Sequence, residues 1–134
     1  MKEDAPHNIA SDIGLAIVNE TSEDSKEEWN VYLLNFKEKP LDTVLISTKG
    51  TGFIERHAIE RQPKRHSIPE VPAQGFVKIE SIPFSFLNFT NEYWVSYFED
   101  HALYDKKYIF LPESVVKDNF TQVPFINKPG IMLK

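Results

Sequence analysis

The sequence predicts an all-β fold, most simply an antiparallel β-sandwich of immunoglobulin-like architecture with one short helix. Short runs rich in β-branched and aromatic residues recur along the chain, and turn residues separate them at short intervals. No helical period extends between these runs, which argues against an α/β plan with crossover helices. Ten of the seventeen aromatic residues lie between positions 84 and 110, as a two-layer core would require.

Length and composition limit the domain organisation. At 134 residues, with 41% hydrophobic and 26% charged residues, the chain has the size and composition of one folded domain. Residues 1–12 lack any periodicity, so we expect a flexible N-terminal tail there. The remaining residues, 13–134, are expected to form a single domain.

The first expected strands lie in the N-terminal half of the chain. Residues 13–18 form a short apolar run that predicts a first edge strand, and residues 29–34 predict a largely buried strand. Pro40 lies in the turn predicted over residues 39–42, so residues 43–48 are expected to return as the antiparallel partner of residues 29–34.

Glycines and prolines mark the next boundaries. Gly50 and Gly52 predict a turn that leads into a third strand over residues 53–59. A charged stretch over residues 62–66 separates this strand from another one predicted over residues 76–82.

The C-terminal third contains the clearest hairpin. Residues 92–98 and 103–111 are rich in aromatic and β-branched residues and are joined by a short polar turn. Pro112 followed by Glu113 favours a short helix over residues 113–118. Residues 123–127 and 131–133 then predict a terminal hairpin.

The net charge of −5 is unevenly distributed along the chain. Residues 1–28 contain eight acidic residues against two lysines, so this segment has a net charge of −6 and the remainder a net charge of +1. An acidic pI therefore does not by itself exclude a nucleic-acid partner, because the acidity is local. No apolar run approaches the length of a membrane span, and we expect no membrane association.

The absence of cysteine excludes disulfides, thiolate nucleophiles and cysteine-ligated metals. The N-terminus has acidic residues where a secretory signal would have basic ones, and no apolar segment follows them. Together these features lead us to expect a cytoplasmic protein.

Two segments carry a family resemblance, residues 91–97 (NEYWVSY) and residues 104–114 (YDKKYIFLPES), with support from residues 31–35 and 47–50. Over residues 29–133 the chain resembles a family of short Bacteroidetes proteins of uncharacterised function. Some members of that family carry the label phenylalanyl-tRNA synthetase alpha subunit. The resemblance therefore implies a possible connection with translation.

The synthetase label can be tested against the residues. Class II synthetases have one motif that resembles Phe-Arg-x-Glu. A second motif is a glycine-rich strand that ends in arginine. Residues 50–56 (GTGFIER) match the second motif, but the chain has no Phe-Arg-x-Glu sequence and is shorter than a class II catalytic domain. We therefore expect no synthetase catalysis and interpret these glycines as turn residues.

A basic segment is the strongest local charge feature of the domain. Its candidate anion- or RNA-binding residues are Arg56, His57, Arg61, Lys64, Arg65 and His66. Such cations could bind phosphates through charge-assisted hydrogen bonds. The alternative, which we favour, is a solvated strand and loop whose cations neutralise the acidic N-terminal segment.

The aromatic hairpin offers a second candidate surface. Alternation places Trp94 and Phe98 on one face of their strand and Tyr93, Val95 and Tyr97 on the other. If one face were open, its aromatic residues would form a contact surface. The candidate interface residues are Tyr93, Tyr97, Tyr104 and Tyr108.

Catalytic and metal-binding motifs are not evident. No serine lies in a Gly-x-Ser-x-Gly elbow, and the nearest metal-like group, Asp100, His101 and Asp105, falls on a predicted hairpin turn. We expect no catalytic residue, no metal and no cofactor. The leading hypothesis is a non-catalytic domain that binds a protein partner or itself through an aromatic sheet face or a strand edge. The alternatives are an RNA- or phosphate-binding accessory domain that uses residues 56–66, and a small enzyme with an unrecognised site.

Overall fold

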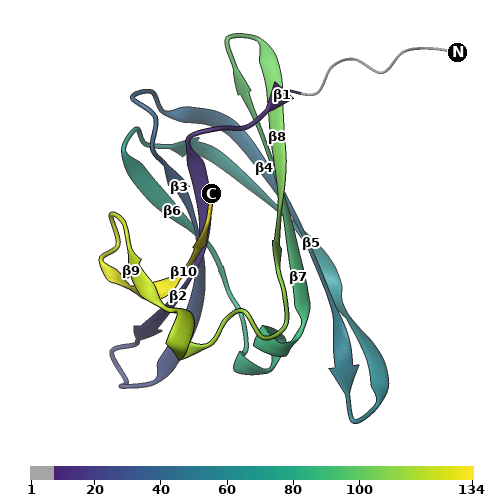
Figure 1. Cartoon of the computed structure of the whole chain (residues 1–134). Helices are drawn as coiled ribbons and strands as arrows, with labels where there is room; N and C mark the ends of the chain where they lie inside the picture. The colour runs from purple at the N-terminus through teal and green to yellow at the C-terminus, as the bar shows by residue number, and fades with distance from the viewer. Residues whose placement is uncertain (1–7) are drawn as a thin grey trace, which may run out of the picture.

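The computed structural model describes residues 8–134, which form ten strands and two short 3₁₀ helices (Figure 1). In chain order the elements are β1 (Asn8–Ile9), β2 (Ile13–Thr21), β3 (Glu27–Asn35), β4 (Leu41–Ile54), β5 (His57–Val71), β6 (Gly75–Ser81), η1 (Phe84–Asn88), β7 (Thr90–Glu99), β8 (Ala102–Phe110), η2 (Lys117–Asn119), β9 (Thr121–Val123) and β10 (Lys128–Leu133). The predicted all-β character of the fold is confirmed.

The strands form two five-stranded sheets. Sheet A has the strand order β1-β8-β7-β4-β5, and sheet B has the order β6-β3-β2-β10-β9. Neighbouring strands are antiparallel except for β1, which pairs parallel with β8. Figure 1 shows the sheets as two layers, with the β4–β5 hairpin extending past the ends of its neighbours.

One main core contains side chains of both sheets. Leu15 and Leu33 of sheet B belong to the same buried cluster as Ile46, Val95 and Tyr97 of sheet A, and all five are almost completely buried. Since alternate residues of a strand point to opposite faces, these residues define the inner face of each sheet.

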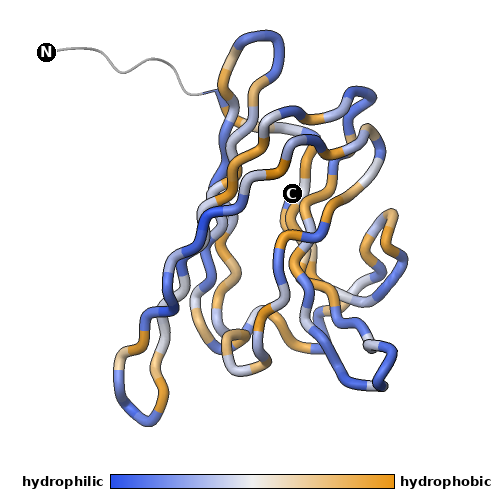
Figure 2. Tube along the Cα trace, turned by 180° about the vertical axis from the view of Figure 1, so that it is seen from behind, coloured by the Kyte–Doolittle hydropathy of each residue, from blue (hydrophilic) through white to orange (hydrophobic). Residues whose placement is uncertain are grey.

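A second, smaller cluster covers the outer face of sheet B. Ala16, Val18 and Leu34 alternate with the residues of the main core and are fully buried on the opposite side of the sheet. Phe36 and Phe125, which come from two connections far apart in the sequence, pack against this face with their ring centroids 5.2 Å apart. Figure 2 shows hydrophobic segments along the strands of sheet B and in the β9–β10 turn beside it.

Two predicted strand positions were wrong. The strand that contains residues 13–18 is not an edge strand, because β2 lies in the middle of sheet B between β3 and β10. The turn at Pro40 does not join paired strands either. It carries the chain from β3 in sheet B to β4 in sheet A, where β4 pairs with β5 and β7.

The predicted glycine turn was also wrong. Gly50 and Gly52 lie inside β4, and the hairpin turns at Glu55 and Arg56, whose φ angles of 50° and 70° are typical of a two-residue hairpin loop. A Cβ at Gly50 would lie 2.4 Å from Cδ of Arg61, and one at Gly52 would lie 2.5 Å from the Phe89 ring. These glycines therefore make room for neighbouring side chains.

The expected charged loop over residues 62–66 is part of β5, which begins at His57 and continues to Val71. The aromatic hairpin is confirmed as β7 and β8, with its turn at Asp100 and His101. The terminal hairpin is confirmed as β9 and β10, although its turn lies over residues 124–127, which were predicted to belong to the first strand.

The helix predicted over residues 113–118 does not form. Val116 is extended, with φ −130° and ψ 151°, and only Lys117–Asn119 form one 3₁₀ turn. Val115 is buried in the main core. Adjacent β-branched valines are poor helix formers, and burial of Val115 fixes the chain in a turn at this point.

Residues 8–10, which were expected to belong to a flexible N-terminal tail, are ordered. Asn8–Ile9 form β1, Ala10 is buried, and the Ala10 amide donates to the Asp105 carbonyl at 3.0 Å. The rest of the predicted tail, residues 1–7, lies outside the described residues. Within residues 8–134, no helix has the length and apolar character needed to cross a membrane.

Candidate functional site

The structure does not gather the basic segment into one surface. Arg56 and His57 are exposed at the tip of the β4–β5 hairpin, and Lys64 is exposed near the inner side of β5. Arg65 is exposed on the outer face of sheet A, because it pairs with Ser47. The remaining two residues, Arg61 and His66, point inward.

Arg61 is buried in an ion pair that joins the edges of the two sheets. Its Nη2 atom donates to both carboxylate oxygens of Glu80 on β6, at 3.0 and 2.9 Å, and the two side chains are only 4% and 7% exposed. Nη1 donates to Asn91 at 3.3 Å, and the guanidinium lies 5.3 Å from the centre of the Phe86 ring. Arg61 is therefore not a free anion-binding residue, which corrects the prediction for this position.

The contacts of Glu80 make it a structural carboxylate. The Tyr93 hydroxyl donates to Glu80 Oε2 at 2.8 Å, and His66 Nε2 lies 3.6 Å from Oε1. Burial alone would lower the pKa of Arg61, but its hydrogen bonds and attraction to Glu80 outweigh this and raise it. Burial, followed by the Glu80 charge, raises the pKa of Tyr93 well above its usual value. A carboxylate with both oxygens bound to fixed donors is poorly placed to act as a general base.

The four tyrosines proposed as interface residues do not lie on an open face. Tyr93 and Tyr97 are fully buried, and Tyr108 is 3% exposed. Tyr104 is partly buried and stacks on Tyr97, with the two ring centroids 5.6 Å apart. The tyrosines belong to the inner face of sheet A, where the predicted alternation places them. This finding moves the candidate surface to the opposite side of the same strands.

The outer face of sheet A is open and carries large apolar side chains. Trp94, Phe98 and Leu45 are 46%, 48% and 52% exposed, and strand pairing places them on one face. The same face includes Leu103 and Ile109 on β8. Scattered single apolar residues are normal on a protein surface, whereas several exposed apolar side chains on one face form the kind of surface that interaction sites use.

A hollow of about 310 Å³ lies in the middle of this outer face. Trp94 and Leu45 form its raised sides, and each pairs with a serine on a neighbouring strand: Trp94 with Ser47, and Leu45 with Ser67 and with Ser96. The small serine side chains leave the space that the large side chains enclose. We call this region the Trp94 hollow.

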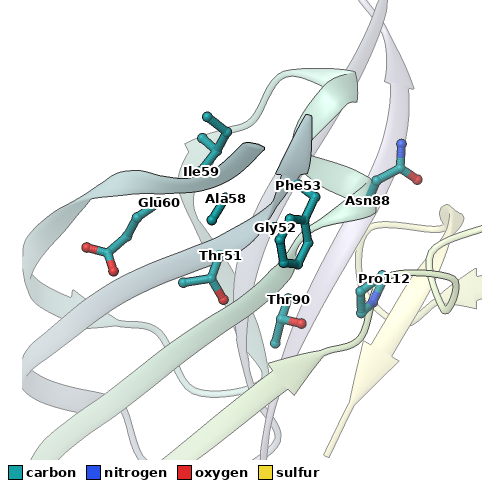
Figure 3. Close-up of a pocket in the computed structure, with 9 residues that line it drawn as sticks. All are labelled: Thr51, Gly52, Phe53, Ala58, Ile59, Glu60, Asn88, Thr90 and Pro112. Atoms are coloured by element: carbon teal, nitrogen blue, oxygen red, sulfur yellow. The ribbon is translucent and has the colours of Figure 1, made fainter. Parts of the chain in front are cut away.

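Two further hollows lie along the same strands. One is bounded by Phe53, which is 73% exposed, together with Thr51, Thr90 and Pro112. Figure 3 shows the Phe53 ring, on the same strand as Thr51, close to Thr90 and Pro112. The other contains Phe98 at the opposite end of the sheet.

Spacing along the strands separates these three aromatic residues. Phe53 is six residues beyond Ser47, the partner of Trp94, and Phe98 is four residues beyond Trp94. At about 3.3 Å per residue, the spacings are about 20 and 13 Å. The open face could therefore accommodate an extended ligand.

Among the described residues, one of the two cations beside Trp94 has a carboxylate partner and the other does not. Lys107 lies 5.4 Å from the centre of the Trp94 ring and 3.3 Å from a carboxylate oxygen of Glu92. Arg65 borders the hollow on the other side, and no carboxylate of residues 8–134 pairs with it. The hollow thus combines apolar sides, serine hydroxyls and one uncompensated cation.

The remaining metal-like group does not assemble. Asp100 and His101 form the β7–β8 turn, and Asp105 lies farther along β8. In the part of the chain that the structure describes, no three histidine or carboxylate side chains are grouped closely enough to hold one ion.

Sequence reasoning missed most of the open face. It placed Trp94 and Phe98 together but did not single out Leu45, Phe53 or Ile109. Apolar residues at successive positions of a strand, as in residues 44–46, predict burial on both faces, and here only one face is covered. No protein-family model matches the chain, and no curated protein matches it in sequence.

Proposed function

We propose that this chain is a non-catalytic binding domain that receives a protein partner on the outer face of sheet A. The observation that carries the proposal is the contrast between the two outer faces. Phe36 and Phe125 cover that of sheet B, whereas Leu45, Trp94 and Phe98 stay about half exposed on that of sheet A. Covering such a group with a partner removes apolar surface from water, which is the main driving force of association.

A sheet face is a better candidate than a strand edge. The long edge strand β5 contains Pro63 and Pro69, which have no N–H group to donate to an added strand. Its middle is also tied to β6 through Arg61 and Glu80. At the other edge of sheet A, the part of β1 that the structure describes is two residues long and pairs with Tyr104 and Asp105 of β8.

The proposal includes the architecture and the compartment. Two five-stranded sheets that share one core support an immunoglobulin-like β-sandwich as the fold type. The absence of cysteine supports a cytoplasmic location.

A comparative capture experiment tests the proposed function. Tagged wild-type protein and a Leu45→Ser, Trp94→Ser double variant are used to recover proteins from native lysate, with quantitative mass spectrometry as the readout. The control is Phe76→Ser, which removes a 39% exposed aromatic side chain from sheet B. We expect a partner that is recovered with wild type and control but lost with the double variant. Equal recovery with all three would contradict the proposal.

The second candidate function is RNA or phosphate binding. It is favoured by one observation, the position of Arg65 beside an exposed tryptophan, since cations and aromatic rings together bind single strands. Ribonuclease treatment of the same captures separates the two functions. RNA binding predicts loss of the recovered partners on treatment and a strong dependence of binding on salt.

A further inference from the structure

We infer that the Trp94 hollow recognises a polypeptide segment that has an acidic residue next to an apolar one, with the apolar side chain against Trp94 and Leu45 and the carboxylate on Arg65. This inference rests on the proposed function and names the kind of partner. Its first support is shape. Each large side chain of the hollow faces a serine, so one inserted apolar side chain can contact both Trp94 and Leu45.

The second support is charge. Arg65 is the exposed cation that borders the hollow, and within the described chain it has no carboxylate partner. On the far side of the ring, Lys107 is already paired with Glu92. A guanidinium binds a carboxylate through two parallel hydrogen bonds, so an incoming acidic residue fits this position.

A second copy of the chain is a poorer occupant. The cross-strand row through the hollow reads Lys107, Trp94, Ser47, Arg65. Two copies packed face to face are related by a two-fold axis that lies between the faces. If the axis follows the strands through the middle of this row, Lys107 lies over Arg65 of the other copy. If the axis follows the row, each cation lies over its own equivalent.

A nucleic-acid strand is also a poorer occupant than a polypeptide. Every nucleotide brings a phosphate, and each phosphate gains by meeting a cation. On the same face Lys107 is already matched by Glu92, and Asp42, which lies opposite Phe98 in the sheet, adds a further carboxylate. One acidic residue can be placed on Arg65 without approaching these carboxylates, whereas a run of phosphates cannot.

Selection from a displayed library of random decapeptides tests the inference. The wild-type protein is expected to enrich peptides with aspartate or glutamate beside an aliphatic or aromatic residue. Arg65→Glu should remove the acidic preference, and Trp94→Ser should remove the enrichment itself. The matched control is Lys64→Glu, which reverses an exposed charge on the next residue, whose side chain lies toward the other side of β5.

The enriched peptide is then titrated into Trp29→Phe protein, in which Trp94 is the single fluorescent tryptophan. A hydrogen bond to a charged group contributes about 1.5 kcal/mol or more, so Arg65→Glu should weaken the peptide at least about tenfold. Lys64→Glu should leave its affinity within about twofold.

Four results would overturn the inference. They are an acidic preference that survives Arg65→Glu, the absence of any enriched peptide, tighter quenching of Trp94 by a twelve-nucleotide single-stranded RNA than by the peptide, and a dimer in light scattering that Trp94→Ser dissociates. If the capture experiment loses its partner with the Leu45→Ser, Trp94→Ser variant while Arg65→Glu retains it, the proposed function stands and this inference fails.

Discussion

The outer faces of the two sheets are built from similar strands, but the chain covers one of them and leaves the other exposed. On sheet B, connections that follow β3 and β9 fold back and bury Ala16, Val18 and Leu34. On sheet A, the equivalent outward side chains, among them Leu45 and Trp94, remain about half exposed. An apolar sheet face can be covered by its own chain or by another molecule, and the difference between the two faces supports the outer face of sheet A as the proposed binding surface.

Two arginines of β5 give the largest expected difference, because Arg61 points inward and Arg65 points outward. Arg61→Leu leaves Glu80 buried without its cation, and breaking a buried ion pair in this way costs about 3–5 kcal/mol. Arg65→Leu, at the exposed position, should change the free energy of unfolding by less than about 0.5 kcal/mol. Urea unfolding of both variants measures the difference.

A double variant checks the cause of this loss. Arg61→Leu combined with Glu80→Leu removes both charges, so it should be more stable than Arg61→Leu alone. If the double variant loses the sum of the two single losses, the ion pair is not the reason for the effect.

Two leucines compare the outer faces directly. Leu34 is fully buried on the outer face of sheet B, and Leu45 is 52% exposed on that of sheet A. Leu34→Ala should lower the free energy of unfolding by about 2–5 kcal/mol because it leaves a cavity. Leu45→Ala should lower it by less than about 0.5 kcal/mol, since exposed positions tolerate truncation. Similar losses at both positions would mean that the face of sheet A is covered.

The buried tyrosines predict the response to alkali. Burial, with a smaller contribution from Glu99, raises the pKa of Tyr97 to about 12, compared with 10.0 for the free side chain. Burial likewise raises the pKa values of Tyr93 and Tyr108. The unfolded chain then releases these protons first, so the contribution of these tyrosines to stability should be constant below pH 10 and fall as the pH rises from 10 toward 12. Thermal unfolding at pH 8, 10 and 11 measures this trend, and constant stability across the series would contradict the burial of these hydroxyls.

Acid should lower the stability contributed by Glu20 on the outer face of sheet B. Burial raises the pKa of Glu20, but hydrogen bonds from Lys128, Tyr32 and Asn30 outweigh it and hold the pKa below the usual 4.5. This carboxylate therefore contributes stability above pH 4.5, and the contribution is lost as the pH falls below that value. Glu20→Gln should reduce the difference in stability between pH 6 and pH 3, as measured by urea unfolding.

The sequence allowed some of these features to be predicted, and the reasons are local. The β7–β8 hairpin could be recognised because its strands and turn are contiguous, and alternation placed Trp94 opposite to Tyr93 and Tyr97. Sheet membership could not be predicted, because a turn such as that at Pro40 joins either paired strands or two different sheets. The pairing of β4 with β7 joins residues up to 56 positions apart, Asp42 with Phe98.

The candidate site depended even more on distant residues. Whether a sheet face is open is decided by segments such as those around Phe36 and Phe125, which belong to other connections. Arg61 and Arg65 look alike in the sequence, and only the position of Glu80 on β6 makes one structural and leaves the other free. The glycines suggested a turn, but their role is to accommodate Arg61 and Phe89.

The comparison of Trp94→Ser with Phe76→Ser tests the central claim most directly. Both substitutions remove a partly exposed aromatic side chain, one from the outer face of sheet A and one from sheet B. With the partner recovered by the wild-type protein in hand, its affinity for each folded variant is measured by calorimetry. We predict a loss of at least about tenfold for Trp94→Ser, as for a central aromatic contact, and no more than about twofold for Phe76→Ser. Equal affinities for the two variants would contradict the assignment of the outer face of sheet A as the binding surface.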